Sequence, residues 1–178
     1  LLDERLGQTH STINRWWEKN WSSERSWAGV RKTGGLIKPA VRAMVLYPTN
    51  ALVEDQMSRL RKTAILSKDI NEGKPLFYFG RYTGTTPGGT ESPPAILDAK
   101  WKKRIQLESE EINDIENESR SFIDKDIDIR AQLPESTCGE MLTRWDMIDA
   151  PPDIFITNLS MLNVMLMIYT VLNMKNIN

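Results

Sequence analysis

The 178-residue sequence is poor in the residues that make disulfides and zinc sites. It contains one cysteine, Cys138, and one histidine, His10. A single cysteine cannot close an internal disulfide, and these two side chains are too few soft ligands for a structural zinc site. The composition therefore favours a reduced, cytoplasmic setting without a structural metal.

The sequence also lacks an excess of positive or negative charge. The 23 Lys and Arg residues are matched by 24 Asp and Glu residues, which gives a formal net charge of −1. Such a balance provides no overall attraction to nucleic acid, so any binding has to depend on local groups. A positively charged start with an apolar core and a small-residue cleavage site is also lacking, so we expect no export.

The length and the apolar content limit the size of the fold. With 178 residues, 40% of them hydrophobic, the chain has enough for one hydrophobic core and is short for two. Residues 154–174 carry no charge, and a stretch of that length raises the question of a transmembrane helix. We expect no membrane span, because the first part is typical of a strand and polar residues interrupt the rest.

The clearest local pattern lies in residues 44–56. Residues 44–47 form an unbroken apolar run, as expected for a strand buried on both faces, and Pro48 ends it because proline has no backbone N–H. Thr49 or Asn50 can cap the helix that follows. That helix is indicated by apolar residues at helical spacing, Val53, Met57, Leu60 and Ala64, with Glu54, Asp55, Arg59 and Lys62 facing elsewhere. A helix N-terminus beside the carboxyl end of a strand is a place where α/β proteins hold anions.

Two such corners resemble motifs of a known family. Residues 47–56, Tyr-Pro-Thr-Asn-Ala-Leu-Val-Glu-Asp-Gln, resemble motif Ia of the superfamily 2, DEAD/DEAH-box-like helicases, especially in large prokaryotic members such as the DISARM-type anti-phage helicases. Residues 151–162 are similar to the family's later strand-to-helix corner, with Thr157 and Asn158 at the turn. Between them, residues 77–86 stand where the family has a strand and a glycine-containing nucleic-acid loop, motif Ib.

The resemblance covers roughly residues 43–167 and implies both a fold and a function. The fold is a partial RecA-like domain of the α/β class over residues 39–178, a mostly parallel sheet with flanking helices. For the complete family protein it implies ATP-dependent unwinding or translocation, with ATP and magnesium as cofactors and single-stranded or duplex nucleic acid as partner. The residues that would contact the phosphate backbone are Pro48, Thr49, Asn50, Gly80, Arg81, Thr83, Thr157 and Asn158.

The loop after the expected middle strand has two interpretations. Residues 83–90 offer hydroxyls and unhindered backbone N–H groups that suit a sugar-phosphate chain. Turn chemistry alone explains the same composition equally well. Arg81 is the stronger candidate, because a fixed cation at a strand end can meet a phosphate.

The two motifs with which the family hydrolyses ATP are absent from this sequence. A Walker A loop requires Gly-x-x-x-x-Gly-Lys-Ser/Thr, and residues 29–36 place Gly35 and Leu36 where the lysine and the hydroxyl are needed. The dipeptide Asp3-Glu4 is a poor candidate for motif II, which the family places after the Thr-Asn corner at a strand end. We therefore expect no cofactor and no catalytic residue in this chain alone. A polypeptide with the remaining helicase motifs is a candidate partner.

The first 38 residues are predicted to be a helical, tryptophan-rich segment followed by a loop. Apolar spacing indicates a helix from the start of the chain to about Lys19. Four tryptophans lie near basic residues and so offer a base-stacking surface. Packing in a core is the favoured interpretation, because tryptophan mostly contributes buried area. The four are Trp16, Trp17, Trp21 and Trp27.

A long helical pattern over residues 95–130 is expected to be an insertion. Its first turns are basic and its second half is strongly acidic. A solvated helical face is the favoured interpretation, and an arm that docks a protein partner or forms a coiled coil is the alternative. Two further possibilities therefore stand beside a helicase component: an inactive helicase remnant, and an interaction module that uses this arm.

Overall fold

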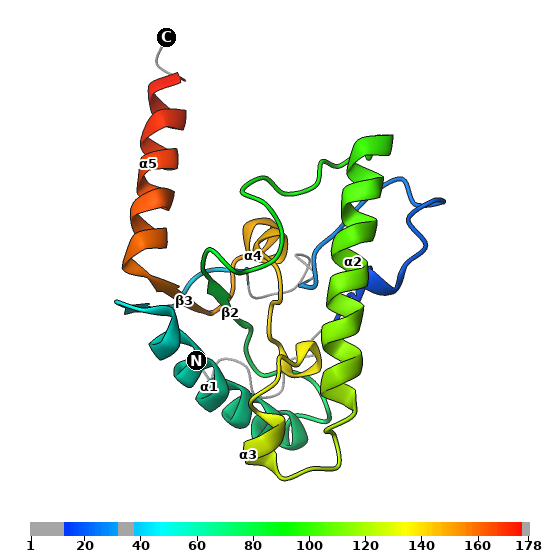
Figure 1. Ribbon diagram of the computed structural model, residues 1–178, viewed down its shortest axis with the longest axis vertical. Helices are drawn as coiled ribbons and strands as arrows, with labels where there is room; N and C mark the ends of the chain where they lie inside the picture. The colour runs from blue at the N-terminus through cyan, green and yellow to red at the C-terminus, as the bar shows by residue number, and fades with distance from the viewer. Residues whose placement is uncertain (1–12, 32–37, 176–178) are drawn as a thin grey trace.

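The computed structural model describes residues 13–31 and 38–175, which form a parallel sheet with helices on both faces (Figure 1). The strands are β1 (Ala43–Tyr47), β2 (Phe79–Tyr82) and β3 (Ile154–Asn158), in the order β1-β3-β2. Both neighbours of β3 run parallel to it, as the register of Tyr47 with Asn158 and of Tyr82 with Thr157 shows. The expected α/β class and parallel sheet are confirmed.

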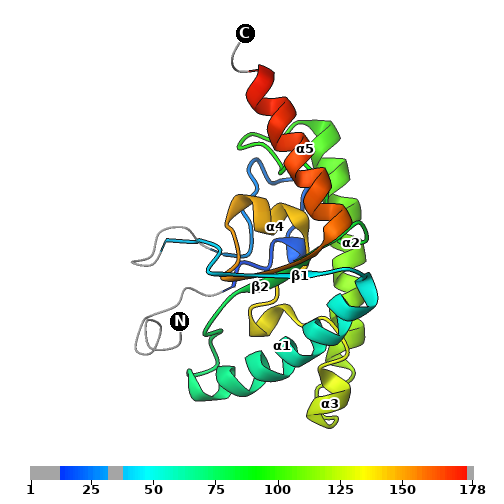
Figure 2. The same ribbon diagram turned by 90° about the vertical axis from the view of Figure 1, so that its left-hand side faces the viewer.

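Helix α1 (Asn50–Ile70) covers one face of the sheet (Figure 2). Its buried residues Val53 and Met57 pack with Phe79 and Ile156 of the strands, as their spacing in the sequence predicts. Beneath this core lie the short helix α3 (Ile127–Arg130) and the 3-10 turn η2 (Ser136–Cys138). The buried Arg61 of α1 donates two hydrogen bonds of 2.7 and 2.8 Å to Glu140, and so fixes the helix to the segment after η2.

The tryptophan-rich segment packs on the opposite face. It contains the 3-10 turn η1 (Trp16–Glu18) and shares one core with Phe155 of the sheet, helix α4 (Arg144–Asp149) and helix α2 (Ala99–Arg120). All four tryptophans predicted for this segment are buried, which confirms the packing interpretation. Trp16 lies at the centre, with its ring within 5.6 to 6.3 Å of the rings of Trp17, Trp21, Trp27 and Trp145.

The helix expected at the N-terminus is not found in residues 13–19, the part of it that the structure describes. Residues 1–12 and the glycine-containing part of the loop, 32–37, lie outside the described residues. From residue 13 to Lys19 the chain forms only the single turn η1, so a helix there is wrong. Distant partners hold this segment instead: Asn14 donates from its backbone to Val30 and from its side chain to Ala28.

The long helical region is shorter than predicted and does not project from the molecule. Helix α2 begins after Asp98, whose carboxylate accepts a hydrogen bond of 2.8 Å from the N–H of Trp101, and it ends at Arg120. Its buried Ile105 and Ile112 pack against the tryptophan-rich segment, while many of its acidic residues are exposed. The interpretation as a solvated face therefore describes the outer side of α2 only.

The sheet is less covered than the apolar run of β1 predicts. Met44 is 54% exposed and Leu46 is 40% exposed, whereas Val45 and Tyr47 face α1 and pack there. Burial on both faces was therefore wrong for β1. The reason is that β1 is an edge strand of the described sheet and α5 (Leu159–Lys175) leads away from the body of the molecule (Figure 1).

Helix α5 is only partly packed. Met161 and Met165 pack partly against the tryptophan core, whereas Val164, Leu166 and Met167 are exposed. Within the described part of the chain, no helix has the length and apolar character needed to cross a membrane.

Candidate nucleic-acid interface

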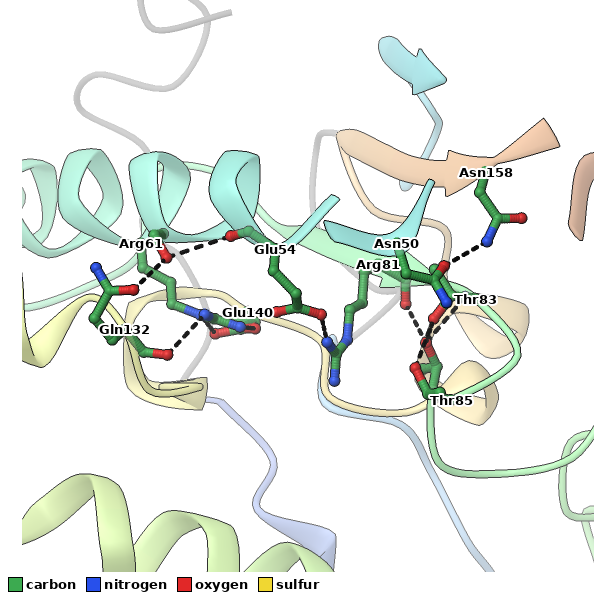
Figure 3. Close-up of polar contacts among 11 residues, drawn as sticks. Asn50, Glu54, Arg61, Arg81, Thr83, Thr85, Gln132, Glu140 and Asn158 are labelled. Carbon is green, nitrogen blue, oxygen red and sulfur yellow. Dashed lines mark hydrogen bonds and ion pairs between the residues drawn. The ribbon is translucent and has the colours of Figure 1, made fainter. Parts of the chain in front are cut away.

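The strand-to-helix corners meet at one edge of the sheet. Because all three strands are parallel, their carboxyl ends lie at the same edge, and the register places the end of β3 between those of β1 and β2. Figure 3 shows Asn50 from the first corner beside Asn158 from the last, with Arg81 and Thr83 of the middle corner nearby. The structure thus brings together the regions in which every predicted contact residue lies.

Asn158 connects two of these corners. Its side-chain Nδ2 donates a 2.6 Å hydrogen bond to Oδ1 of Asn50, and its Oδ1 accepts a 2.7 Å hydrogen bond from the N–H of Met161. The second bond caps the start of α5, while the first holds Asn50 at the start of α1. Two helix N-termini therefore open at the same edge, and the partial positive charge at each favours an anion there.

The first corner is the exposed part of the site. Pro48, Thr49 and Asn50 are all exposed. Thr49 occupies the N-cap position of α1 with extended backbone angles, φ −133° and ψ 157°, yet its side chain makes no capping hydrogen bond. The capping bond that the sequence allows is thus not made, and a ligand at this corner would meet the Thr49 hydroxyl beside the first N–H groups of α1.

Two of the predicted residues at the last two corners are buried and serve packing. A Cβ on Gly80 would lie 2.7 Å from Sδ of Met147 and 3.1 Å from the carbonyl oxygen of Met141, so β2 packs closely against these two residues. Thr157 is buried, and its Oγ1 donates a 2.6 Å hydrogen bond to the carbonyl of Tyr82. Both residues hold the edge in place without reaching solvent.

Thr83 lies inside a tight loop rather than on its surface. Its N–H donates to Oγ1 of Thr86 over 3.0 Å, and Oγ1 of Thr86 donates to the carbonyl of Arg81 over 2.9 Å. The loop is fixed from outside as well, because the N–H of Gly88 donates a 3.1 Å hydrogen bond to Glu108 of α2. The hydroxyl of Thr86 and the N–H of Thr83 therefore bond within the turn.

Arg81 is half-buried and forms an ion pair with Glu54 of α1 (Figure 3). The side chains are 26% and 48% exposed, respectively. Sequence reasoning placed Glu54 away from the apolar face of its helix and gave it no role at the site, although two signals were present. Arg81 follows Phe79 by two residues and so shares the face of the sheet that packs on α1, and Glu54 follows Asn50 by one helical turn.

The cavity that Arg81 lines is small. The cavity there has a volume of about 90 Å³ and is lined by Arg81, Thr85, Glu111 and Glu140 among others, whereas small-molecule sites usually enclose about 300 Å³ or more. Among the described residues, no three His, Cys, Asp or Glu side chains are placed to hold a metal ion. The cavity beside Arg81 is therefore smaller than a typical small-molecule site.

Comparison with known proteins gives one short similarity. The chain is 46% identical over 54 residues to Druantia protein DruE of Escherichia coli (strain UMEA 4076-1). The matched stretch amounts to 28% of this chain and 3% of DruE, so the chain spans a very small part of that relative. No protein-family model matches the sequence, and no solved structure matches it.

Proposed function

We propose that this chain is a component of a nucleic-acid helicase and that it contacts the sugar-phosphate backbone of one strand at the carboxyl edge of its sheet. The observation that carries the proposal is the hydrogen bond between Asn50 and Asn158, which joins two strand-to-helix corners and their helix N-termini. Contacts to phosphates carry no base sequence, so binding should be weak and unselective. The partial similarity to DruE supports a helicase-related role.

The predicted contact residues divide into two groups under this proposal. Pro48, Thr49 and Asn50 are exposed and would touch the strand directly, with Arg81 beside them. Gly80, Thr83, Thr157 and Asn158 are buried and would position that edge. ATP-dependent unwinding belongs to the proposal for the complete protein, with ATP and magnesium bound by motifs that this sequence lacks.

Fluorescence anisotropy with labelled single-stranded DNA and RNA of mixed sequence tests the proposal. A hydrogen bond to a charged group contributes about 1.5 to 3 kcal/mol, so Thr49→Ala should weaken binding by about tenfold. Raising the salt concentration should weaken binding of the unchanged chain, because each phosphate contact releases counterions.

Thr63→Ala is the matched control. Thr63 is exposed on the same helix, and its hydroxyl donates a 3.0 Å hydrogen bond to the carbonyl of Arg59, so its loss should leave affinity unchanged. Strong sequence selectivity, or an affinity that does not change with salt, would contradict backbone contacts. Equal affinities of Thr49→Ala and Thr63→Ala would show that the first corner is not part of the interface.

A further inference from the structure

Glu54 pairs with Arg81, the cation that would contact a phosphate in the proposed interface. It lies one helical turn after Asn50, and its carboxylate forms an ion pair with the guanidinium of Arg81. Figure 3 shows the two side chains pointing toward each other from α1 and β2, close to the Asn50–Asn158 contact. A carboxylate therefore occupies Arg81 at the edge where a nucleic-acid strand would bind.

The ion pair is of the kind that exchanges partners easily. Both side chains are partly exposed, at 26% for Arg81 and 48% for Glu54, and such pairs contribute between about 0 and 1 kcal/mol to stability. An arginine binds a phosphate through the same fork of N–H groups that it offers to a carboxylate. A phosphate at this edge can thus replace Glu54 without disturbing the fold.

The other acidic group close to Arg81 in the interior already has partners. Glu140 lines the cavity beside Arg81, but its two oxygens accept hydrogen bonds from Arg61, and one also accepts from the N–H of Glu135. Glu111 lines the same cavity from the exposed side of α2. Glu54 is the carboxylate that contacts the Arg81 guanidinium directly.

We propose that Glu54 is an internal competitor for Arg81, displaced when a nucleic-acid phosphate binds at the corner. This inference rests on the proposed function. Binding then has to break the ion pair and bring a phosphate close to the released carboxylate, and both effects lower the affinity. Glu54 accordingly sets how weakly the interface binds, and it is an affinity-determining residue of the edge.

Glu54→Gln tests this role, because glutamine keeps the size of the side chain and removes its charge. We expect Glu54→Gln to bind a labelled single-stranded oligonucleotide about three- to tenfold more tightly at low salt, with a smaller gain at high salt. In an Arg81→Gln background the same change should bring much less gain. The thermal midpoint of unfolding should hardly change, because the pair is a partly exposed one.

Asp55→Asn supplies the matched control. Asp55 lies next in the sequence, is 61% exposed and pairs with Arg59 over 3.0 Å, so its change removes the same charge at a place that does not touch Arg81. Its gain in affinity should be clearly smaller than that of Glu54→Gln. The difference between the two variants isolates the competition for Arg81 from the general effect of net charge.

Three outcomes would overturn the inference, and they separate it from the proposed function. If Glu54→Gln binds like the unchanged chain or like Asp55→Asn, while Thr49→Ala still weakens binding, the competition is wrong and the interface stands. If the full gain persists in the Arg81→Gln background, Glu54 acts by repulsion and not by occupying Arg81. If no variant binds nucleic acid, the interface and the competition are both wrong.

Discussion

At the residue scale, Asp146 shows how a buried carboxylate joins distant parts of the chain. Its Oδ1 accepts hydrogen bonds from the indole of Trp16 at 2.9 Å and from the N–H of Val30 at 3.0 Å, and its Oδ2 accepts one of 2.6 Å from the hydroxyl of Thr143. Burial raises the pKa of Asp146 from 3.8 to about 6, although these hydrogen bonds act in the opposite direction. The ionised form is therefore disfavoured in the folded chain.

The raised pKa predicts how stability depends on pH. The folded chain holds the proton of Asp146 more tightly than the unfolded chain, so the stabilising contribution is complete below about pH 4 and is lost as pH rises through about 6. A difference of about two pKa units corresponds to about 3 kcal/mol. Urea unfolding of the unchanged chain and of Asp146→Asn between pH 4 and 7 measures this contribution, which the variant should lack. If the free energy of unfolding changed with pH equally in the two proteins, the pKa of Asp146 would not be raised in the folded chain.

Single residues were predictable where strand geometry alone determined them. A parallel sheet places the Thr-Asn corners at one edge, because parallel strands end at the same edge. The ion pair of Glu54 with Arg81 and the burial of Thr83 were not predicted. The first needs the register of α1 against β2. Thr83 instead bonds to Thr86 within its own turn, and the loop is also held by Glu108, which lies 20 residues further along the chain from Gly88.

At the element scale, β1 and α5 each expose apolar side chains. Met44 and Leu46 of β1 are exposed, and so are Val164, Leu166 and Met167 of α5. Helix α5 has 17 residues, and most of the stability of a helix in a protein comes from the packing of one of its faces. An unbroken apolar run does not reveal whether another element covers it, so the sequence overestimated the burial of β1.

The exposed face of α5 should bind a hydrophobic dye and promote self-association. Contiguous apolar patches have this effect, whereas single exposed apolar residues do not. The double variant Leu166→Lys, Met167→Lys should reduce the fluorescence of bound anilinonaphthalene sulfonate by about half or more and lower the aggregate fraction in light scattering. Ile70→Lys with Ile96→Lys removes two strongly exposed apolar residues elsewhere and should have little effect. A sharp, monomeric melt without dye binding would show that α5 is covered in solution.

At the scale of the whole molecule, the fold is a parallel sheet between two different cores. The resemblance of the two strand-to-helix corners to the helicase family implied the α/β class, and the four tryptophans predicted a core. The sequence did not show that this second core lies on the sheet face opposite α1 and is closed by α2. That arrangement depends on contacts such as Trp21 with Ser109, 88 residues apart, which no local pattern encodes.

The whole-molecule proposal also predicts what this polypeptide does with ATP. Phosphoryl transfer in the helicase-like families needs a lysine on the phosphates and a carboxylate on magnesium, and the sequence has neither in its motif. Removal of one such contact to the transition state typically costs about 3 kcal/mol or more, so the loss of two leaves no useful rate. Purified chain should release phosphate from ATP no faster than buffer, with or without single-stranded nucleic acid. Turnover that elutes with the chain and rises on addition of nucleic acid would contradict this, whereas turnover only after addition of a polypeptide carrying motifs I and II would support a divided helicase.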